Sequence, residues 1–176
     1  MKNIITTAIL ICLMFSGLFI SAQEETTLVK LSDAVPSFEF EKSPGKTQNI
    51  SELKGKTVLI TFFATWCGPC RKELPHIQSK IFNKYKNNPN FELVILGREH
   101  SWEEVNKFKA ENKFIMPFYP DPKRSIYSKF AKQFIPRNFL ISPEGRILFS
   151  TIGFEDKDFK QLKEMIENQL KKGNKG

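Results

Sequence analysis

Cys67 and Cys70 are the residues whose type and spacing best support chemistry in this sequence. They lie in the stretch ATWCGPCRKE, residues 64–73, and are two of the three cysteines among 176 residues. Such a pair could form a structural disulfide, hold a soft metal ion such as Cu(I), or open and close as a redox couple. A disulfide that closes so short a loop restricts the unfolded chain very little, so it contributes little stability. The spacing therefore favours a redox pair over a structural staple.

The neighbouring sequence places Cys67 where a buried strand ends and a helix begins. TVLITFFA, residues 57–64, is an almost continuous β-branched and aromatic run, typical of a strand buried on both faces. Apolar residues then recur at helical spacing and predict a helix over residues 68–85. The amino terminus of a helix stabilises a thiolate, so we expect the pKa of Cys67 to lie below the ~8.5 of free cysteine. Cys70 follows three residues later, on the same face of the first turn.

The residues around the two cysteines fit a reactive pair. Gly68 would let the backbone of another chain approach the first sulfur. Pro69 is favourable in the first helical turn, because no N–H partner is lost there. Trp66 could cover the sulfurs or serve only in packing. Arg71 and Lys72 add positive charge, although such side chains are usually solvated.

Further along the chain, strand and helix patterns alternate. SELK at residues 51–54 predicts one helical turn, and a serine N-cap with Glu104 three residues later predicts a capping box at the start of a helix. Pro75 lies inside the first long helix and is expected to kink it. This order indicates an α/β fold with a mixed sheet and helices on both faces. The predicted strands or extended pieces cover residues 36–41, 57–64, 91–97 and 116–122. Two further strands, joined by the turn SPEG, are predicted within residues 137–151. The later helices are predicted over residues 101–112, 124–134 and 156–170.

The amino-terminal stretch has the layout of an export signal. One lysine precedes an apolar run, and small residues follow, so residues 1–22 are predicted to be a signal peptide cleaved after Ala22. Ile4 to Ile20 spans 17 residues, which leaves an uncleaved membrane anchor open. Either alternative predicts a periplasmic or otherwise extracytoplasmic protein. Cys12 is interpreted as a passive apolar residue. Residues 23–34 then form a polar linker, 35–170 the domain, and 171–176 a basic flexible tail.

The positive charge indicates a solvated surface and no nucleic-acid partner. The formal net charge is +8, and loss of Lys2 with the signal leaves +7. Lysines are spread along the chain and mostly alternate with acidic residues in the helical segments, which is typical of a solvated surface. His76 and His100 are isolated from each other in sequence and are interpreted as surface residues, with no metal ligand role.

The segment TFFATWCGPCRKELP, residues 61–75, resembles the active-site segment of the thioredoxin superfamily. The sequence upstream of it, LSDAVPSFEFEKSPGKTQNISELKGK, is similar to the TlpA/ResA-type extracytoplasmic thiol–disulfide oxidoreductases. FIPRNFLISPEGRILF, residues 134–149, resembles the proline–strand–turn–strand element of the same family. The resemblance covers Val35 to Leu170. It implies a thioredoxin-like fold with an N-terminal strand extension.

The resemblance also implies roles for individual residues. Cys67 would attack a partner disulfide, and Cys70 would resolve the mixed disulfide. Pro136 aligns with the cis-proline of the family, so the Ile135–Pro136 bond should be cis, and a substrate strand would pair with Ile135. The family usually has a small hydroxyl residue after this proline. Arg137 stands there instead, and we expect a basic side chain beside the groove that favours acidic partners.

A carboxylate that accepts protons is also expected. Thioredoxins carry an aspartate six residues before the first cysteine, where this sequence has Thr61. Glu73 lies three residues after the second cysteine on the same helical face, as in TlpA/ResA-type proteins. Partial burial would raise its pKa and let it take the proton of Cys70. An ordinary surface glutamate is the alternative.

The preferred function is thus an extracytoplasmic thiol–disulfide oxidoreductase, expected to reduce protein disulfides. The resemblance implies no cofactor beyond the Cys67–Cys70 disulfide and a membrane-bound electron donor; cytochrome c maturation is one role within the family. A peroxiredoxin-like peroxidase is the less favoured enzyme, because Ile60 and Ala64 replace its required proline and threonine. A copper-binding or non-catalytic thioredoxin-like module is the third alternative, although copper-handling relatives usually have three residues between their cysteines and an added histidine.

Overall fold

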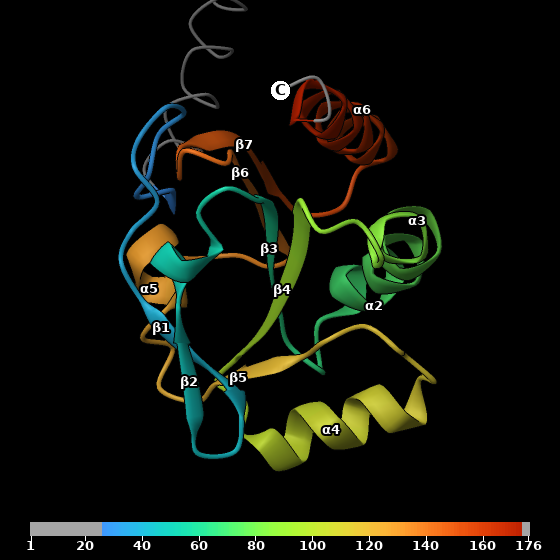
Figure 1. Ribbon diagram of the computed structural model, residues 1–176. Coiled ribbons are helices and arrows are strands. Elements are labelled where there is room, and N and C mark those ends of the chain that lie inside the picture. The colour runs from blue at the N-terminus through green and yellow to red at the C-terminus, as the bar shows by residue number, and fades with distance from the viewer. Residues whose placement is uncertain (1–25, 174–176) are drawn as a thin grey trace, which may run out of the picture.

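The computed structural model describes residues 26–173 and is built on a five-stranded mixed sheet (Figure 1). The strand order is β5-β4-β3-β6-β7. β3 pairs in parallel with β4 and antiparallel with β6, while β4 and β5 are parallel and β6 and β7 antiparallel. The predicted α/β class with a mixed sheet is confirmed. The strands are β3 Thr57–Phe63, β4 Phe91–Arg98, β5 Tyr119–Asp121, β6 Arg137–Ile141 and β7 Ile147–Ile152.

The central strand β3 is apolar because both of its faces are covered. All seven of its residues are buried. Leu59 and Phe63 belong to the core cluster on one face, and Ile60 and Phe62 belong to the cluster on the other. This arrangement explains why its sequence is a continuous apolar run without the alternation of a half-exposed strand.

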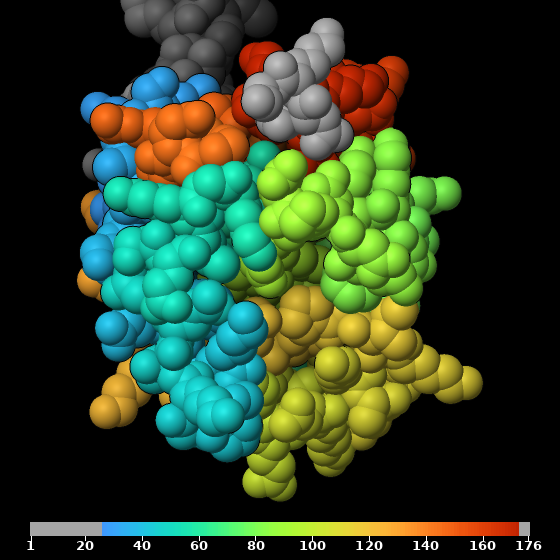
Figure 2. Space-filling view, in the orientation of Figure 1, coloured from blue at the N-terminus to red at the C-terminus, as the bar shows by residue number. Residues whose placement is uncertain are grey.

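Five helical segments, which form three continuous helices, contribute to the core cluster that contains Leu59 and Phe63. The first long helix carries Leu74, Ile77 and Ile81 into this cluster, and the C-terminal helix carries Leu162, Ile166 and Leu170. Figure 2 shows the first long helix (green) and the N-terminal hairpin (cyan) on opposite sides of the molecule. The segments are α2 Gly68–His76, continued by η2 Ile77–Phe82 and α3 Asn83–Tyr85; α4 Trp102–Glu111; and α6 Asp156–Gly173.

The opposite face is covered by smaller elements. β1 Glu39–Ser43 and β2 Lys46–Asn49 form a separate antiparallel hairpin, which leads into the 3-10 turn η1 Ile50–Leu53. α5 Tyr127–Phe130 completes this layer, so helices lie on both faces as predicted. The hairpin is the predicted N-terminal strand extension, although β2 was not expected from the sequence.

The first long helix changes geometry after Pro75. It is helical from Gly68 to Tyr85, close to the predicted 68–85, but residues Ile77–Phe82 are π-helical. Proline removes a backbone donor from the helix interior. A π-helical segment that follows it widens the turns locally, which is a recognised way for a helix to absorb such a defect.

The predicted helix over 124–134 is shorter in the structure. Only Tyr127–Phe130 is helical. Ala131 has extended backbone and forms an antiparallel bridge with Thr27. The chain therefore leaves the helix early because a long-range pairing with the N-terminal segment replaces the helical hydrogen bonds.

The described part of the predicted linker lies against the domain. Leu28 N–H donates to the carbonyl of Phe130 (2.9 Å), and Ala34 bridges to Arg146. The predicted signal peptide or anchor and Cys12 lie outside the described residues, as do the last three residues of the predicted tail. Between Thr26 and Gly173, no helix is long and apolar enough to cross a membrane.

Candidate redox-active site

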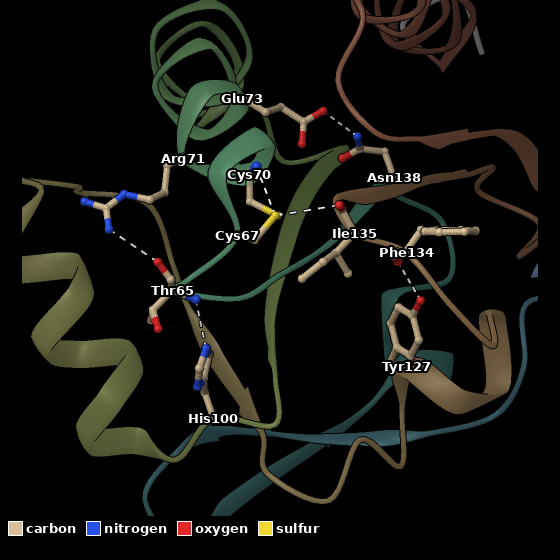
Figure 3. Close-up of a disulfide and its surroundings, with 10 residues drawn as sticks. All are labelled: Thr65, Cys67, Cys70, Arg71, Glu73, His100, Tyr127, Phe134, Ile135 and Asn138. Carbon is tan, nitrogen blue, oxygen red and sulfur yellow. Dashed lines mark hydrogen bonds between the residues drawn. A yellow bond between two sulfur atoms is a disulfide. The ribbon is translucent and has the colours of Figure 1, made fainter.

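Cys67 and Cys70 form a disulfide at the junction of β3 and α2 (Figure 3). The S–S distance is 2.03 Å and the Cα–Cα distance 5.3 Å. Cys67 is the N-cap residue of α2, and its sulfur accepts a hydrogen bond from the N–H of Cys70 at 3.2 Å. The predicted placement at a helix amino terminus is thus confirmed. The N–H of Cys70, which has no partner within the helix, and the helix dipole both favour negative charge on this sulfur once the disulfide is open.

A loop after α5 lies directly opposite the disulfide. The Ile135–Pro136 peptide bond is cis, as predicted. The carbonyl oxygen of Ile135 lies 3.6 Å from the sulfur of Cys67 (Figure 3). Ile135 is half-buried, and Pro136 is buried. The cis bond therefore brings a backbone acceptor next to the sulfur that would react first.

Three of the sequence-predicted contact residues lie at the surface around the disulfide. Gly68 and Pro69 are exposed in the first turn of α2. Trp66 is 63% exposed, and its ring faces the guanidinium of Arg98 at 5.4 Å. Trp66 is therefore accessible to another molecule. The disulfide itself is mostly shielded, since Cys67 is 4% exposed.

Glu73 is buried in a polar network beneath the disulfide. It is 2% exposed, and its Oε1 accepts a hydrogen bond from Asn138 Nδ2 at 2.6 Å. The same amide group donates to Thr151 Oγ1 at 3.1 Å, while Asn138 Oδ1 accepts from Thr61 Oγ1 at 2.8 Å. The other carboxylate oxygen of Glu73 has no hydrogen-bond partner. Hydrogen bonds through Asn138 thus link Thr61 to Glu73.

The surroundings of Glu73 favour its protonated form. Burial raises its pKa from 4.5 to about 7, and the hydrogen bond from Asn138 opposes part of this shift. A buried carboxyl that titrates near neutrality can accept and release a proton under working conditions. The alternative of an ordinary surface glutamate is excluded by its burial.

The expectation for Arg137 is wrong. Its side chain is fully buried and does not line a groove beside the disulfide. The guanidinium donates to Thr27 Oγ1 at 2.5 Å, to the carbonyl and hydroxyl of Thr26, and to the carbonyl of Gln133. A buried arginine needs acceptors for its N–H groups, and backbone and hydroxyl oxygens of the N-terminal segment provide them here.

The surface interpretation of His100 is also wrong, whereas His76 is exposed as expected. His100 is 4% exposed, and its Nε2 accepts a hydrogen bond from the backbone N–H of Thr65 at 2.9 Å (Figure 3). Arg71 Nη1 donates to the carbonyl of the same residue at 3.4 Å. Both polar groups of the Thr65 backbone, two residues before Cys67, are therefore held by side chains.

Sequence reasoning missed Asn138 and His100 as supporting residues. One usable signal for His100 is Gly97, where an added Cβ would lie 2.6 Å from Val105 and 3.1 Å from His100. A glycine inside an otherwise apolar strand indicates the close approach of another group. Asn138 offered no comparable signal, because a single polar residue in a strand is compatible with many environments.

No candidate metal centre is found among residues 26–173, where no three His, Cys, Asp or Glu side chains cluster in a way that could hold an ion. The site as described contains two cysteines, a buried carboxyl and a cis-proline loop.

Comparisons with known proteins agree with this geometry. The Redoxin family model matches residues 30–166. The thiol-disulfide oxidoreductase ResA of Bacillus thuringiensis (strain Al Hakam) is 28% identical over 176 residues, covering 97% of each chain. The solution structure of a candidate protein disulfide isomerase from Bacteroides thetaiotaomicron superimposes with a TM-score of 0.79 at 34% identity, covering 85% of this chain and 95% of that one. StoA from Bacillus subtilis gives a TM-score of 0.60 at 28% identity, covering 74% and 96%.

The matched family segment includes the cysteine pair, Glu73 and the cis-proline loop. Its sheet and helices carry these groups to one end of β3, where the disulfide forms. The chain therefore belongs to the Redoxin family and is a thioredoxin-like thiol–disulfide oxidoreductase, which acts on protein disulfides.

Proposed function

We propose that this protein works outside the cytoplasm and reduces disulfides of client proteins. The observation that carries the proposal is the position of the Ile135 carbonyl, 3.6 Å from the sulfur of Cys67 at the start of α2. An extended client segment that pairs with the backbone of Ile135 would have its own disulfide next to that sulfur. Backbone pairing of this kind binds many sequences, because main-chain groups are common to all of them.

In the proposed reaction, the Cys67 thiolate attacks one sulfur of the client disulfide. A Cys67–client disulfide forms, and the other client sulfur leaves as a thiolate and takes up a proton. The Cys70 thiolate then attacks the Cys67 sulfur, so the Cys67–Cys70 disulfide forms and the second client thiolate is released. The client gains two electrons and two protons, and the enzyme dithiol loses them.

Glu73 is proposed to accept the proton of Cys70 before the second attack. Its raised pKa, about 7, allows it to be unprotonated in part of the molecules at neutral pH and still to hold a proton firmly when it receives one. The hydrogen bond from Asn138 keeps the carboxylate oriented in the buried network. We assign substrate contacts to Trp66, Gly68, Pro69, Ile135 and Pro136, which surround the disulfide.

The setting is inferred from the sequence. Residues 1–22 are proposed to direct export, either as a cleaved signal or as a retained membrane anchor, and residues 23–34 to lead into the domain at 35–170. A membrane-bound electron donor would return two electrons to the Cys67–Cys70 disulfide after each cycle. Maturation of c-type cytochromes is one client pathway that this class of reductase suggests.

A trapping experiment tests this function. Cys70→Ser lacks the resolving thiol, so it should accumulate covalent, thiol-sensitive adducts through Cys67 with extracytoplasmic proteins, whereas Cys67→Ser should form none. The wild-type protein should also reduce insulin disulfides. A redox potential near the strongly oxidising value of about −120 mV would contradict the reductase assignment, because such a dithiol donates electrons poorly.

A further inference from the structure

Phe134 is an exposed aromatic residue held in a strained backbone conformation beside the disulfide. Its side chain is 56% exposed, and its φ is 68°. A bulky residue rarely adopts positive φ, because its Cβ then crowds the backbone. Glycine would take this conformation without that penalty. Strain of this kind points to a role for the side chain that glycine could not fill.

The loop around Phe134 is clamped by side chains at three successive carbonyls. Arg124 Nη2 donates to the carbonyl of Lys132, Arg137 to that of Gln133, and Tyr127 Oη to that of Phe134, the last at 2.6 Å. The next carbonyl, that of Ile135, has no such clamp and faces the sulfur of Cys67 (Figure 3). The three clamps therefore fix the loop and leave the acceptor beside the sulfur available.

Tyr127 links this loop to the other exposed aromatic residue of the site. The guanidinium groups of Arg98 and Arg124 lie 5.2 and 4.9 Å from the centre of its ring. Arg98 in turn lies 5.4 Å from the ring of Trp66. Cation–π attraction stabilises this series of rings and guanidinium groups. A continuous series of contacts through Tyr127 and Arg98 thus joins the Phe134 loop to Trp66.

We infer that Phe134 is a specificity-determining residue, which binds a large apolar side chain of the client within about three residues of the client cysteine. Figure 3 shows the ring of Phe134 directed away from Cys67, one residue beyond Ile135. A client strand that pairs with Ile135 passes over this ring after a few residues, at about 3.3 Å per residue. Burial of two apolar surfaces there stabilises the encounter before thiolate attack. This inference rests on the proposed function and names the class of client segment.

Two probe peptides test the inference. Each probe is a homodimer of a short peptide, joined by a disulfide through its single cysteine. The leucine peptide carries leucine at the second and third positions on both sides of the cysteine, and the serine peptide carries serine at the same positions. The reduced wild-type protein should react about tenfold faster with the leucine peptide, the order of discrimination that one apolar contact provides. Rates are followed by single-turnover quenching and alkylation of the released thiols.

Phe134→Gly removes the side chain and suits the backbone conformation. The variant should fold with an unfolding midpoint no lower than that of the wild type, keep the redox potential of Cys67–Cys70, and react with both peptides at the rate of the serine peptide. Phe134→Leu should keep most of the discrimination. Leu31→Ser, a change at another exposed apolar residue (61% exposed) near the far end of β7, should leave both rates unchanged.

Tyr127→Phe tests the clamp without disturbing the stacked ring. It removes the hydroxyl that binds the Phe134 carbonyl and that also interacts with the Arg137 guanidinium, so it should reduce the ratio of the leucine peptide rate to the serine peptide rate. Undiminished discrimination in Phe134→Gly, or an equal loss of both rates, would overturn the inference. A wild-type protein that reduced neither peptide would contradict the proposed function as well as this inference.

Discussion

At the scale of single residues, burial changes the titration of Glu73. Its carboxyl is buried against Asn138, with one oxygen unpartnered, and burial raises its pKa to about 7. In the unfolded chain the same group titrates near 4.5. Between these two pH values the native state binds more protons than the unfolded chain. The free energy of unfolding should therefore fall as the pH rises from 4.5 to about 7 and stay level above it.

Glu73→Gln should remove this pH dependence. The full effect of the shifted carboxyl is about 3 kcal/mol, since each unit of pKa difference corresponds to about 1.4 kcal/mol. The oxidised variant should therefore be more stable than the wild type by up to about 3 kcal/mol at pH 8 and equally stable at pH 4, as measured by urea unfolding. Glu111→Gln, a change at an exposed glutamate, should match the wild type at both pH values.

The same variant separates the structural and chemical roles of Glu73. If the carboxylate accepts the proton of Cys70, resolution of a preformed Cys67 mixed disulfide should be about 100-fold slower in Glu73→Gln near pH 8. The release of the client thiol after mixing reports this rate. A variant that is stabilised as expected but resolves the mixed disulfide at the wild-type rate would show that Glu73 has no part in the proton transfer.

At the scale of elements, the start of α2 is expected to increase the reactivity of Cys67. The sulfur occupies the N-cap position, where helix N–H groups and the helix dipole favour its thiolate. In the reduced protein, Cys67 should be alkylated by iodoacetamide at a lower pH than free cysteine, while the fully buried Cys70 should react more slowly at every pH. Mass spectrometry of the labelled peptides separates the two sites. Alkylation of Cys67 with the pH profile of free cysteine would contradict this view of the helix terminus.

The connection between β3 and α2 depends on a histidine from a different element. His100 follows β4 and accepts the backbone N–H of Thr65. His100→Leu leaves that N–H without its partner, so it should lower the free energy of unfolding by about 1–3 kcal/mol. The matched change His76→Leu affects an exposed histidine and should alter stability by less than about 0.5 kcal/mol. Equal effects of the two changes in urea unfolding would rule out a special role for His100.

At the scale of the whole molecule, the N-terminal segment is part of the folded domain. Arg137 is fully buried, and Thr26 and Thr27 supply much of its hydrogen bonding. A buried guanidinium that loses these acceptors keeps its desolvation cost without the compensating bonds. Thr26 and Thr27, which follow the predicted export signal, therefore stabilise β6 through its first residue, Arg137.

Two truncations test this coupling. A protein that begins at Leu28 should be less stable than one that begins at Thr26 by about 2–4 kcal/mol, because only the first lacks both threonines. The unfolding midpoint of each in urea gives the comparison. The control protein that begins at Thr26 retains every contact described here for Arg137. Identical midpoints would mean that solvent replaces the two threonines without cost.

Much of the framework and the reactive pair could be predicted because their signals are local. The apolar run of β3, the capping box of Ser101 and Glu104, and the SPEG turn each depend on neighbouring residues, and all three are present. The cysteine pair follows from its spacing and from the strand-to-helix junction. Resemblance to a known family added the cis bond before Pro136, which local propensity alone would not have indicated.

By itself, the sequence determined which two cysteines lie together at a helix start and which class of fold contains them, since chain neighbours specify a helix start, a turn or a buried strand. The tertiary structure decided the environment of Arg137, of His100, and of Glu73 with Asn138. These contacts join residues separated by 110, 35 and 65 positions in the chain. Burial and hydrogen bonding at such distances depend on how the sheet and its covering layers pack, and this packing is why an arginine expected beside the groove lies inside the domain.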